Sequence, residues 1–344
     1  MPRPLGRTFS AVLICLPLPA FFRKSRPLMT ALYRSDRFLR HRTGNHPERP
    51  QRLLAVEEGL SRSGLLEKCR LAQWEPASIE SVGLCHTAEH VGDLKERSAC
   101  GGGAYDADTV LCEESYDVAL YAAGAACDAV ERVLLGKDAN AFCLVRPPGH
   151  HAVADRAMGF CLFNNVAVAA KRALELGVDR ALIVDFDVHH GNGTQDLFWE
   201  DPRVGFLSIH RYPFWPGSGC ASETGAGDGL GTTLNVPMAA DVTPREYLHA
   251  LASSLEHLAD KLRPEIILVS AGFDAHRHDP IGSLGLDAED FACITTLLVE
   301  AARSYCDGRL VSLLEGGYHA AALAECVQVH LAGLLDAAEE SQEL

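Results

Sequence analysis

Four short apolar runs constrain the fold of this chain, because each one ends in a cluster of polar residues and glycines. The runs cover residues 141–146, 180–187, 265–270 and 309–314. Short, continuously apolar runs bounded by glycine and proline are typical of strands in a parallel sheet that is buried on both faces. The sequence therefore predicts that these four runs form parallel strands at the centre of the molecule.

Helical segments separate the predicted strands. Residues 165–176 are rich in alanine, and residues 244–262 follow Thr243, which is a suitable N-cap. Alternation of strands and helices predicts an α/β fold in which helices flank a mostly parallel central sheet on both faces. No repeat, low-complexity tract or linker divides the chain. We therefore expect one domain over residues 30–344, preceded by an N-terminal extension, residues 1–29, that is either a misassigned start or a targeting segment.

The polar clusters all follow predicted strand ends. They are Pro-Pro-Gly-His-His after the first run, the segment ending in His189 after the second, Gly-Phe-Asp274 after the third and Gly-Gly-Tyr318 after the fourth. Ligands of open α/β sheets bind outside the carboxyl ends of the strands. Because all four clusters belong to such ends, we expect one functional site there.

A catalytic metal site is predicted from two of these clusters. If the second strand continues through residues 185–189, alternation puts Asp185, Asp187 and His189 on one face. A single aspartate at a strand end usually caps a loop, but Asp187, His189 and Asp274 together form a two-carboxylate, one-histidine ligand set. Three protein ligands leave a coordination position for water and substrate, as in catalytic zinc sites. We expect zinc, with iron in the cell as the alternative, because this ligand set accepts either ion.

Two adjacent histidines, His150 and His151, follow a rigid Pro-Pro-Gly turn. Their side chains point in different directions, so their pKa values can differ. One can then carry a proton from water to a leaving amine while the other stays charged and stabilises negative charge. Tyr318 follows two glycines, which permit close approach, and its phenol is suited to donate to an oxyanion. A lone buried histidine, or a tyrosine beside glycines, more often has a packing role.

Three aromatic residues could belong either to the core or to a substrate-binding slot. Phe160, Phe214 and Trp215 either pack in the core, which residue type alone favours, or form the walls of a narrow slot. Such walls would suit the aliphatic stem of a lysine or a polyamine.

Charge and cysteine usage limit the partners and the compartment. The net charge is −15, but residues 1–52 contain eleven basic and two acidic residues, which leaves 20 basic and 44 acidic residues, or −24, in the remainder. Direct nucleic-acid binding is therefore not expected. The twelve cysteines are scattered without a Cys-x-x-Cys pair, which favours a reducing, cytoplasmic location. The apolar stretch 9–22 resembles a signal-peptide core, so an organelle or export signal is the alternative, and it is too short to span a membrane.

The motifs together resemble the histone deacetylase family, specifically its class II-like branch with bacterial deacetylases and acetylpolyamine amidohydrolases. The resemblance covers roughly residues 31–320. It rests on His-Pro-Glu-Arg-Pro at 46–50, Arg-Pro-Pro-Gly-His-His at 146–151, Gly-Phe-Cys-Leu-Phe-Asn-Asn at 159–165, Asp-x-Asp-x-His-His-Gly-Asn-Gly-Thr at 185–194, Ser-Ala-Gly-Phe-Asp at 270–274 and Glu-Gly-Gly-Tyr at 315–318. It implies the arginase/deacetylase-like fold and zinc bound by the three residues named above.

The resemblance also implies a role for each catalytic residue. His151 would act as general base and then as general acid. His150, paired with Asp185, would be its electrostatic partner, and Tyr318 would polarise the acyl carbonyl. Asn192 stands beside the second histidine, where some relatives have an aspartate, and would tune His151. A structural potassium ion is implied near Asp185, Asp187, His189 and Ser208.

Substrate preference is inferred from the same resemblance. The polyamine-selective eukaryotic relative has a glutamate after the Asp-Pro that follows the third metal ligand, whereas this chain has Ile281, which suits an acyl-lysine pocket better. Trp215, where phenylalanine is common, would narrow the slot and disfavour bulky acyl groups. The expected substrate-binding residues are Gly159, Phe160, Phe214, Trp215 and Ile281.

We therefore expect a zinc-dependent amidohydrolase that removes acetyl, or a similar short acyl group, from lysine side chains of proteins or peptides. The alternatives are a deacetylase of small acetylated amines such as acetylpolyamines and a non-catalytic acyl-lysine binding protein, which the presence of Tyr318 disfavours. A dinuclear manganese ureohydrolase such as arginase is also disfavoured, because Ala-His-Arg follows Asp274 in place of further bridging aspartates. The sequence leaves homo-oligomerisation open.

Overall fold

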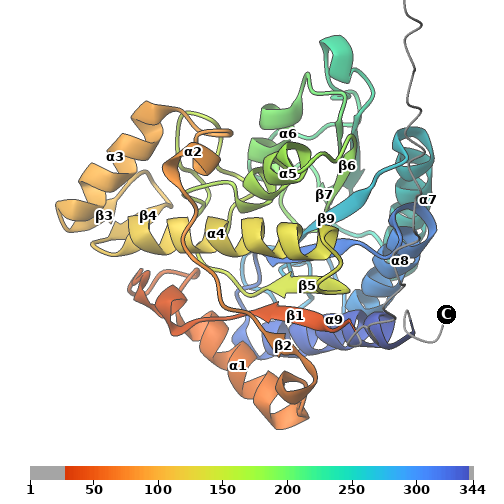
Figure 1. Ribbon diagram of the computed structural model, residues 1–344, viewed down its shortest axis with the longest axis horizontal. Coiled ribbons are helices and arrows are strands. Elements are labelled where there is room, and N and C mark those ends of the chain that lie inside the picture. The colour runs from red at the N-terminus through yellow and green to blue at the C-terminus, as the bar shows by residue number, and fades with distance from the viewer. Residues whose placement is uncertain (1–27, 341–344) are drawn as a thin grey trace, which may run out of the picture.

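The central sheet of the computed structural model, which describes residues 28–340, has eight strands in the order β2-β1-β5-β10-β9-β6-β7-β8 (Figure 1). Every neighbouring pair is parallel. The strands are β1 (Thr30–Tyr33), β2 (Arg70–Leu71), β5 (Asn140–Cys143), β6 (Ala181–Asp185), β7 (Val204–Arg211), β8 (Thr233–Met238), β9 (Ile266–Ala271) and β10 (Leu310–Leu314). A separate antiparallel hairpin is formed by β3 (Gly102–Ala104) and β4 (Val110–Cys112).

Helices cover both faces of this sheet. In Figure 1, α4 lies on one side of β5 and α9 on the other, and both pack against β5 and β1. On the first face α4 packs with α5, and on the second α9 packs with α1 and α8. The helices are α1 (Gln51–Ser63), α2 (Ile79–Val82), α3 (Ala88–Ala99), α4 (Ser115–Leu134), α5 (Asn165–Glu175), α6 (Asn192–Phe198), α7 (Pro244–Leu262), α8 (Ala288–Cys306) and α9 (Ala320–Glu340). Three short 3-10 turns cover Asp36–Arg40, Leu66–Lys68 and Gly227–Gly229.

The predicted fold class is confirmed, and the four apolar runs are the four central strands β5, β10, β9 and β6. Every residue of these four strands is buried, on both faces of the sheet, because helices cover both faces. The helix predicted over 244–262 matches α7 at both ends, and Thr243 is its N-cap. Residues 1–27, which hold most of the predicted N-terminal extension, lie outside the described residues, so the domain boundary stays a prediction.

The second strand is shorter than predicted. It ends at Asp185, because Asp185 Oδ1 accepts a hydrogen bond from the Asp187 backbone N–H at 3.1 Å and Asp187 Oδ1 accepts one from the His189 N–H at 3.0 Å. Side-chain bonds of this kind compete with the sheet ladder and turn the chain. The expectation that Asp185, Asp187 and His189 share one strand face is therefore wrong.

Strand register brings the polar clusters together. Asp185 at the end of β6 is level with Ser270 on β9 and Ser208 on β7. Leu314 at the end of β10 is level with Ala271 on β9. Because β5, β10, β9 and β6 are consecutive in the sheet, the loops that follow them emerge side by side at one edge.

Helix α9 is the one described helix that is long and apolar enough, by composition, to cross a membrane, with a mean hydropathy of 1.3 over its most apolar window. It packs against α1 and α8, and 56% of that window is buried inside the domain. Core helices of globular domains have the same composition, and here the apolar surface is used for packing.

Candidate active site

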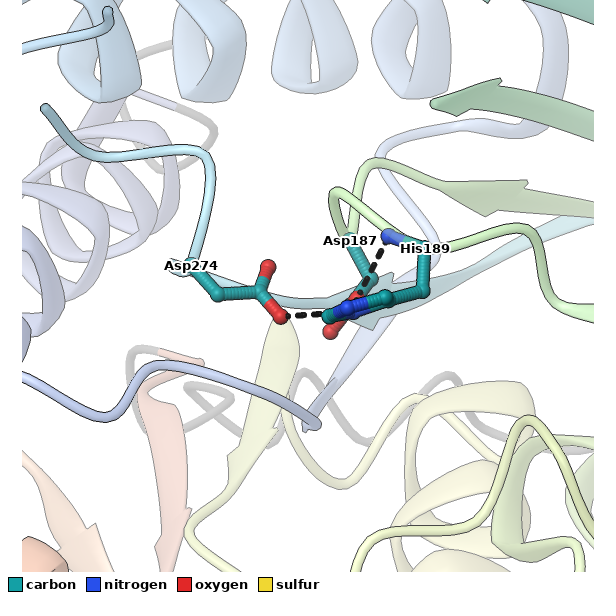
Figure 2. Close-up of side chains that lie close together, drawn as sticks. All are labelled: Asp187, His189 and Asp274. Atoms are coloured by element: carbon teal, nitrogen blue, oxygen red, sulfur yellow. Dashed lines mark hydrogen bonds and ion pairs between the residues drawn. The ribbon is translucent and has the colours of Figure 1, made fainter. Parts of the chain in front are cut away.

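Three side chains from two loops converge at the carboxyl edge of the sheet (Figure 2). Asp187 and His189 follow β6, and Asp274 follows β9. One ligand atom from each lies within 4.8 Å of the other two, and all three residues are buried. His189 Nδ1 lies 3.1 Å from both Asp187 Oδ1 and Asp274 Oδ2. The structure thus brings the three predicted metal ligands together.

Two glycines make room for the carboxylates. A Cβ atom on Gly316 would lie 2.6 Å from Asp187 Oδ2 and would collide with Asp274 Oδ2, and one on Gly272 would collide with Asp187. The backbone also orients both acids: the Gly316 N–H donates to Asp187 Oδ2 at 2.8 Å, and the Val188 N–H donates to Asp274 Oδ1 at 2.9 Å. Each carboxylate is therefore held in place by a backbone donor.

The electrostatics of these three residues suit a cation. Burial, together with the nearby charge of Asp187, raises the pKa of Asp274 to about 7. Burial alone would lower the pKa of His189, but hydrogen bonds to Asp187 and Asp274 outweigh it and raise that pKa to about 10. Two buried carboxylates that crowd one imidazole attract positive charge, and an ion bound there would relieve their repulsion. The residues present fit a divalent metal ion.

The two adjacent histidines lie beside this cluster with different partners. His150 Nδ1 is 2.9 Å from Asp185 Oδ2, and His151 Nδ1 is 2.8 Å from Asn192 Oδ1. Their ring centroids are 3.8 Å apart. Asp185 thus lies behind His150 and outside the triad, and Asn192, the first residue of α6, pairs with His151.

These partners move the two pKa values in opposite directions. Burial alone would lower the pKa of His150, but the carboxylates of Asp185 and Asp187 outweigh it and raise that pKa to about 10. Burial and the neighbouring rings of His150 and His189 lower the pKa of His151 well below its usual range. These shifts favour a charged His150 and a neutral His151 near neutral pH, and the roles that the sequence predicts for the pair stay predictions.

Tyr318 follows β10 on the loop Glu315-Gly316-Gly317. Its ring lies edge-on to that of Phe160, with centroids 5.6 Å apart, and its backbone N–H donates to Asp279 Oδ2 at 2.6 Å. Burial and the Asp274 carboxylate raise the pKa of Tyr318 well above its usual range. The phenol therefore keeps its proton and is available as a donor beside the acidic cluster.

Sequence reasoning missed a group of buried charges behind this loop. Arg52 donates to the backbone oxygens of Gly317, at 2.6 Å, and of Glu315, and its guanidinium lies 5.0 Å from the Tyr318 ring centroid. Glu48 pairs with Arg52 at 3.1 Å and with Arg146. Both arginines are almost fully buried. The motif at 46–50 was noted, but no local pattern shows that charged residues more than 90 positions apart meet in the interior.

Comparison with known proteins agrees with this geometry. The family model described as the histone deacetylase domain matches residues 46–334. The chain belongs to the histone deacetylase family. A probable deacetylase of Archaeoglobus fulgidus is 40% identical over 294 residues, which cover 85% of this chain and 82% of that protein. The human polyamine deacetylase HDAC10 is 41% identical over 302 residues, which cover 84% of this chain and 44% of that protein.

A solved structure is similar throughout. The crystal structure of the HDA15 HD domain superposes with a TM-score of 0.87 at 34% sequence identity and covers 92% of each chain. The likeness confirms the arginase/deacetylase fold. Membership of the histone deacetylase family puts the chain among hydrolases that act on amides. Catalysis in this family depends on a metal, and the triad described above could hold one.

In this member of the histone deacetylase family, the three aromatic residues lie at the site and outside the core, Phe214 and Trp215 against His189 and Phe160 against Tyr318. The Phe214 ring is stacked on His189 at 5.3 Å, and the Trp215 indole meets His151 edge-on at 4.6 Å. Trp215 is 39% exposed. A Cβ on Gly159 would lie 2.5 Å from Trp215 and 2.6 Å from His151, so only glycine fits below the indole. The interpretation of these aromatics as core residues is therefore wrong.

Two predicted site residues lie on neighbouring segments, Ser208 on β7 and Ile281 in the loop after Asp274. Ser208 is buried on β7 and its hydroxyl lies 2.9 Å from His210 Nδ1. Its register beside Asp185 agrees with the arrangement expected for a potassium site, which stays a prediction. Ile281 is half-buried in the loop between Asp274 and α8, and its backbone N–H donates to Asp279 Oδ1 at 2.9 Å.

Proposed function

We propose that this chain removes acetyl, or similarly short acyl, groups from lysine side chains of proteins or peptides by zinc-dependent hydrolysis. The observation that carries the proposal is the convergence of Asp187, His189 and Asp274 within 4.8 Å, beside a neutral histidine and a protonated tyrosine. Metal-dependent amide hydrolysis uses three such groups: a metal site, a base for water and a donor for the oxyanion.

A metal bound by the triad would polarise the acyl carbonyl and make water more acidic. His151, uncharged and oriented by Asn192, would accept the proton of the attacking water and return it to the leaving nitrogen. His150, charged beside Asp185, would stabilise the negative charge that develops. Tyr318 would donate a hydrogen bond to the oxyanion. The carbonyl carbon gains the oxygen of water, the carbon–nitrogen bond breaks, and acetate and an amine leave.

The residues around the triad support a lysine side chain as the group that enters. Phe160, Phe214 and Trp215 offer apolar ring faces to a chain of methylenes, and Ile281 adds no negative charge to the loop after Asp274. The narrow space between Gly159 and Trp215 supports a short acyl group.

Small acetylated amines are the second candidate substrate. The 41% identity to human HDAC10, whose name is polyamine deacetylase, supports it. So does the acidic composition of residues 53–344, because an acidic protein attracts cationic amines.

The test is acetate release by the zinc-loaded full-length chain from an acetyl-lysine peptide and from N-acetylputrescine. We expect faster turnover of the peptide, and we expect Tyr318→Phe to lower kcat by at least about 100-fold, the typical cost of one oxyanion donor. Zinc content, measured in both proteins, should stay at one ion per chain. Tyr305→Phe, which changes a half-buried tyrosine on α8 that bonds to Asp260, is the matched control.

The outcomes separate the two candidates. Turnover of the amine alone would replace the proposal by the second one. No turnover of either substrate at one bound zinc per chain would leave neither standing, and equal rates with zinc and with iron would refute the zinc dependence.

A further inference from the structure

The Asp279 carboxylate accepts three backbone hydrogen bonds. Its Oδ2 accepts from the Tyr318 N–H at 2.6 Å, and its Oδ1 accepts from the N–H groups of Ile281 and Gly282 at 2.9 and 3.0 Å. Asp279 is only 7% exposed. A buried carboxylate with three N–H donors is a strong and directional anchor. It connects the loop after Asp274 to the loop that carries Tyr318, 39 residues further along the chain.

The loop that holds Asp279 is itself tied to the proposed metal ligand. The Ser283 N–H donates to the backbone oxygen of Asp274 at 2.8 Å, and Arg211 donates to the oxygen of Gly282 at 3.0 Å. The Asp279 N–H donates to the oxygen of His276 at 2.9 Å. The Asp279 carboxylate is therefore fixed relative to Asp274.

Tyr318 depends on an anchor at its own amide, because the hydrogen bonds that hold the residues before it, from the Gly316 N–H to Asp187 and from Arg52 to the Gly317 oxygen, end one residue short of it. Gly316 and Gly317 precede it, Gly317 has a φ of 120°, and α9 begins only at Ala320. Glycines permit many backbone conformations. Arg52 binds the carbonyl side of this loop, at Glu315 and Gly317, and Asp279 binds the amide of Tyr318 itself.

We propose that Asp279 is a positioning residue for the hydrolysis: its carboxylate holds the Tyr318 backbone so that the phenol faces the proposed metal ligands. This proposal rests on the proposed function. Asp279 acts through Tyr318 and does not contact the substrate. Since Tyr318 is assigned an interaction with the oxyanion of the transition state, loss of the anchor lowers kcat and leaves KM nearly unchanged.

The first test is a double-mutant cycle in the full-length zinc protein. Asp279→Asn preserves the size of the side chain, but its amide nitrogen cannot accept the N–H on its side, so part of the anchor is lost in either orientation. We expect kcat to fall about 10-fold or more with KM within 2-fold. In a Tyr318→Phe background the same change should lower kcat by less than 2-fold, because coupled residues give non-additive effects.

Asp290→Asn is the matched control. Asp290 also accepts a backbone N–H, from Asp287 at 2.8 Å, but it caps α8, and its kcat should equal that of the parent. An equal fall of kcat for Asp279→Asn in both backgrounds would overturn the proposal, as would loss of the bound zinc, because either result means that Asp279 acts on something other than Tyr318.

A second measurement does not depend on turnover. Amide hydrogen exchange of residues 315–320 should be at least about 10-fold faster in Asp279→Asn than in the parent, with α7 unchanged as an internal reference. Unchanged exchange would overturn the anchor. Faster exchange in a protein that hydrolyses no acetylated substrate would uphold the anchor while refuting the proposed function.

Discussion

At the scale of single residues, Gly316 sets the geometry of the proposed metal ligands. Its Cα faces both carboxylates, so a methyl group there would collide with Asp274 and lie 2.6 Å from Asp187 Oδ2. We expect Gly316→Ala to weaken zinc binding by about 10–100-fold, the usual cost of a change next to the ligands. The dissociation constant can be measured by competition with a chromophoric chelator.

Gly92→Ala in α3 is the control for this substitution, because a Cβ at that position meets no atom within 4 Å. Its zinc affinity should equal that of the parent. Unchanged affinity in Gly316→Ala, with the fold intact by circular dichroism, would mean that the carboxylates shift freely and that the site is not preorganised.

At the scale of elements, α7 begins with a complete capping box. Thr243 Oγ1 accepts the Glu246 N–H at 3.3 Å, and Glu246 Oε2 accepts the Thr243 N–H at 2.9 Å. Because both bonds are exposed and local, we expect Thr243→Ala to lower the free energy of unfolding by about 1 kcal/mol without changing turnover. Urea unfolding of the two proteins measures the difference.

Thr296→Ala removes a threonine from an exposed position inside α8 and should leave the stability equal or slightly higher, because alanine favours helix interiors. A Thr243→Ala protein as stable as the parent would show that packing of α7, and not its cap, determines where this helix starts.

Elements with strong local signals could be predicted from the sequence, and long-range contacts could not. The cap at Thr243 and the apolar runs of the four central strands are local patterns, and the structure reproduces them. The turn after Asp185 depends on two side-chain bonds, in which Asp185 accepts the Asp187 N–H and Asp187 accepts the His189 N–H. These bonds compete with strand continuation and have no periodic signal in the sequence. The contacts of Arg52 and Asp279 with the tyrosine loop join segments 265 and 39 residues apart, so no local pattern indicates them.

At the scale of the whole molecule, buried histidines contribute to the loss of stability in acid. Burial lowers the pKa of four histidines away from the triad to about 3 or 4: His41, His86, His210 and His330. In the unfolded chain each has a pKa of about 6.5. The unfolded state therefore binds protons below pH 6.5 that the folded state does not, and stability is lost as the pH falls from about 6.5 to 4.

His330 offers the sharpest test of this dependence. It is fully buried on α9 and bonds to Thr295 of α8 and Ser312 of β10 at 2.7 and 2.8 Å. We expect His330→Gln to lower the stability at pH 7 and to reduce the slope of the unfolding free energy between pH 6 and 4.5 by about 1.4 kcal/mol per pH unit, the contribution of one proton.

Urea unfolding at several pH values gives the slope. His257→Gln, which changes an exposed histidine on α7, should retain the slope of the parent. If the slope of His330→Gln also matched the parent, His330 would take up a proton while folded.

The order of strands in the sheet has a consequence for the synthesis of this protein. Strand β10, residues Leu310–Leu314, lies between β5 and β9 near the middle of the sheet, although it is made last of all the strands. A nascent chain that ends before residue 310 has a gap between β5 and β9, with unpaired edges on both sides and without the tyrosine loop. The central sheet is therefore complete only after residue 314 has been made, and until then the facing edges of β5 and β9 are open to pairing with other chains.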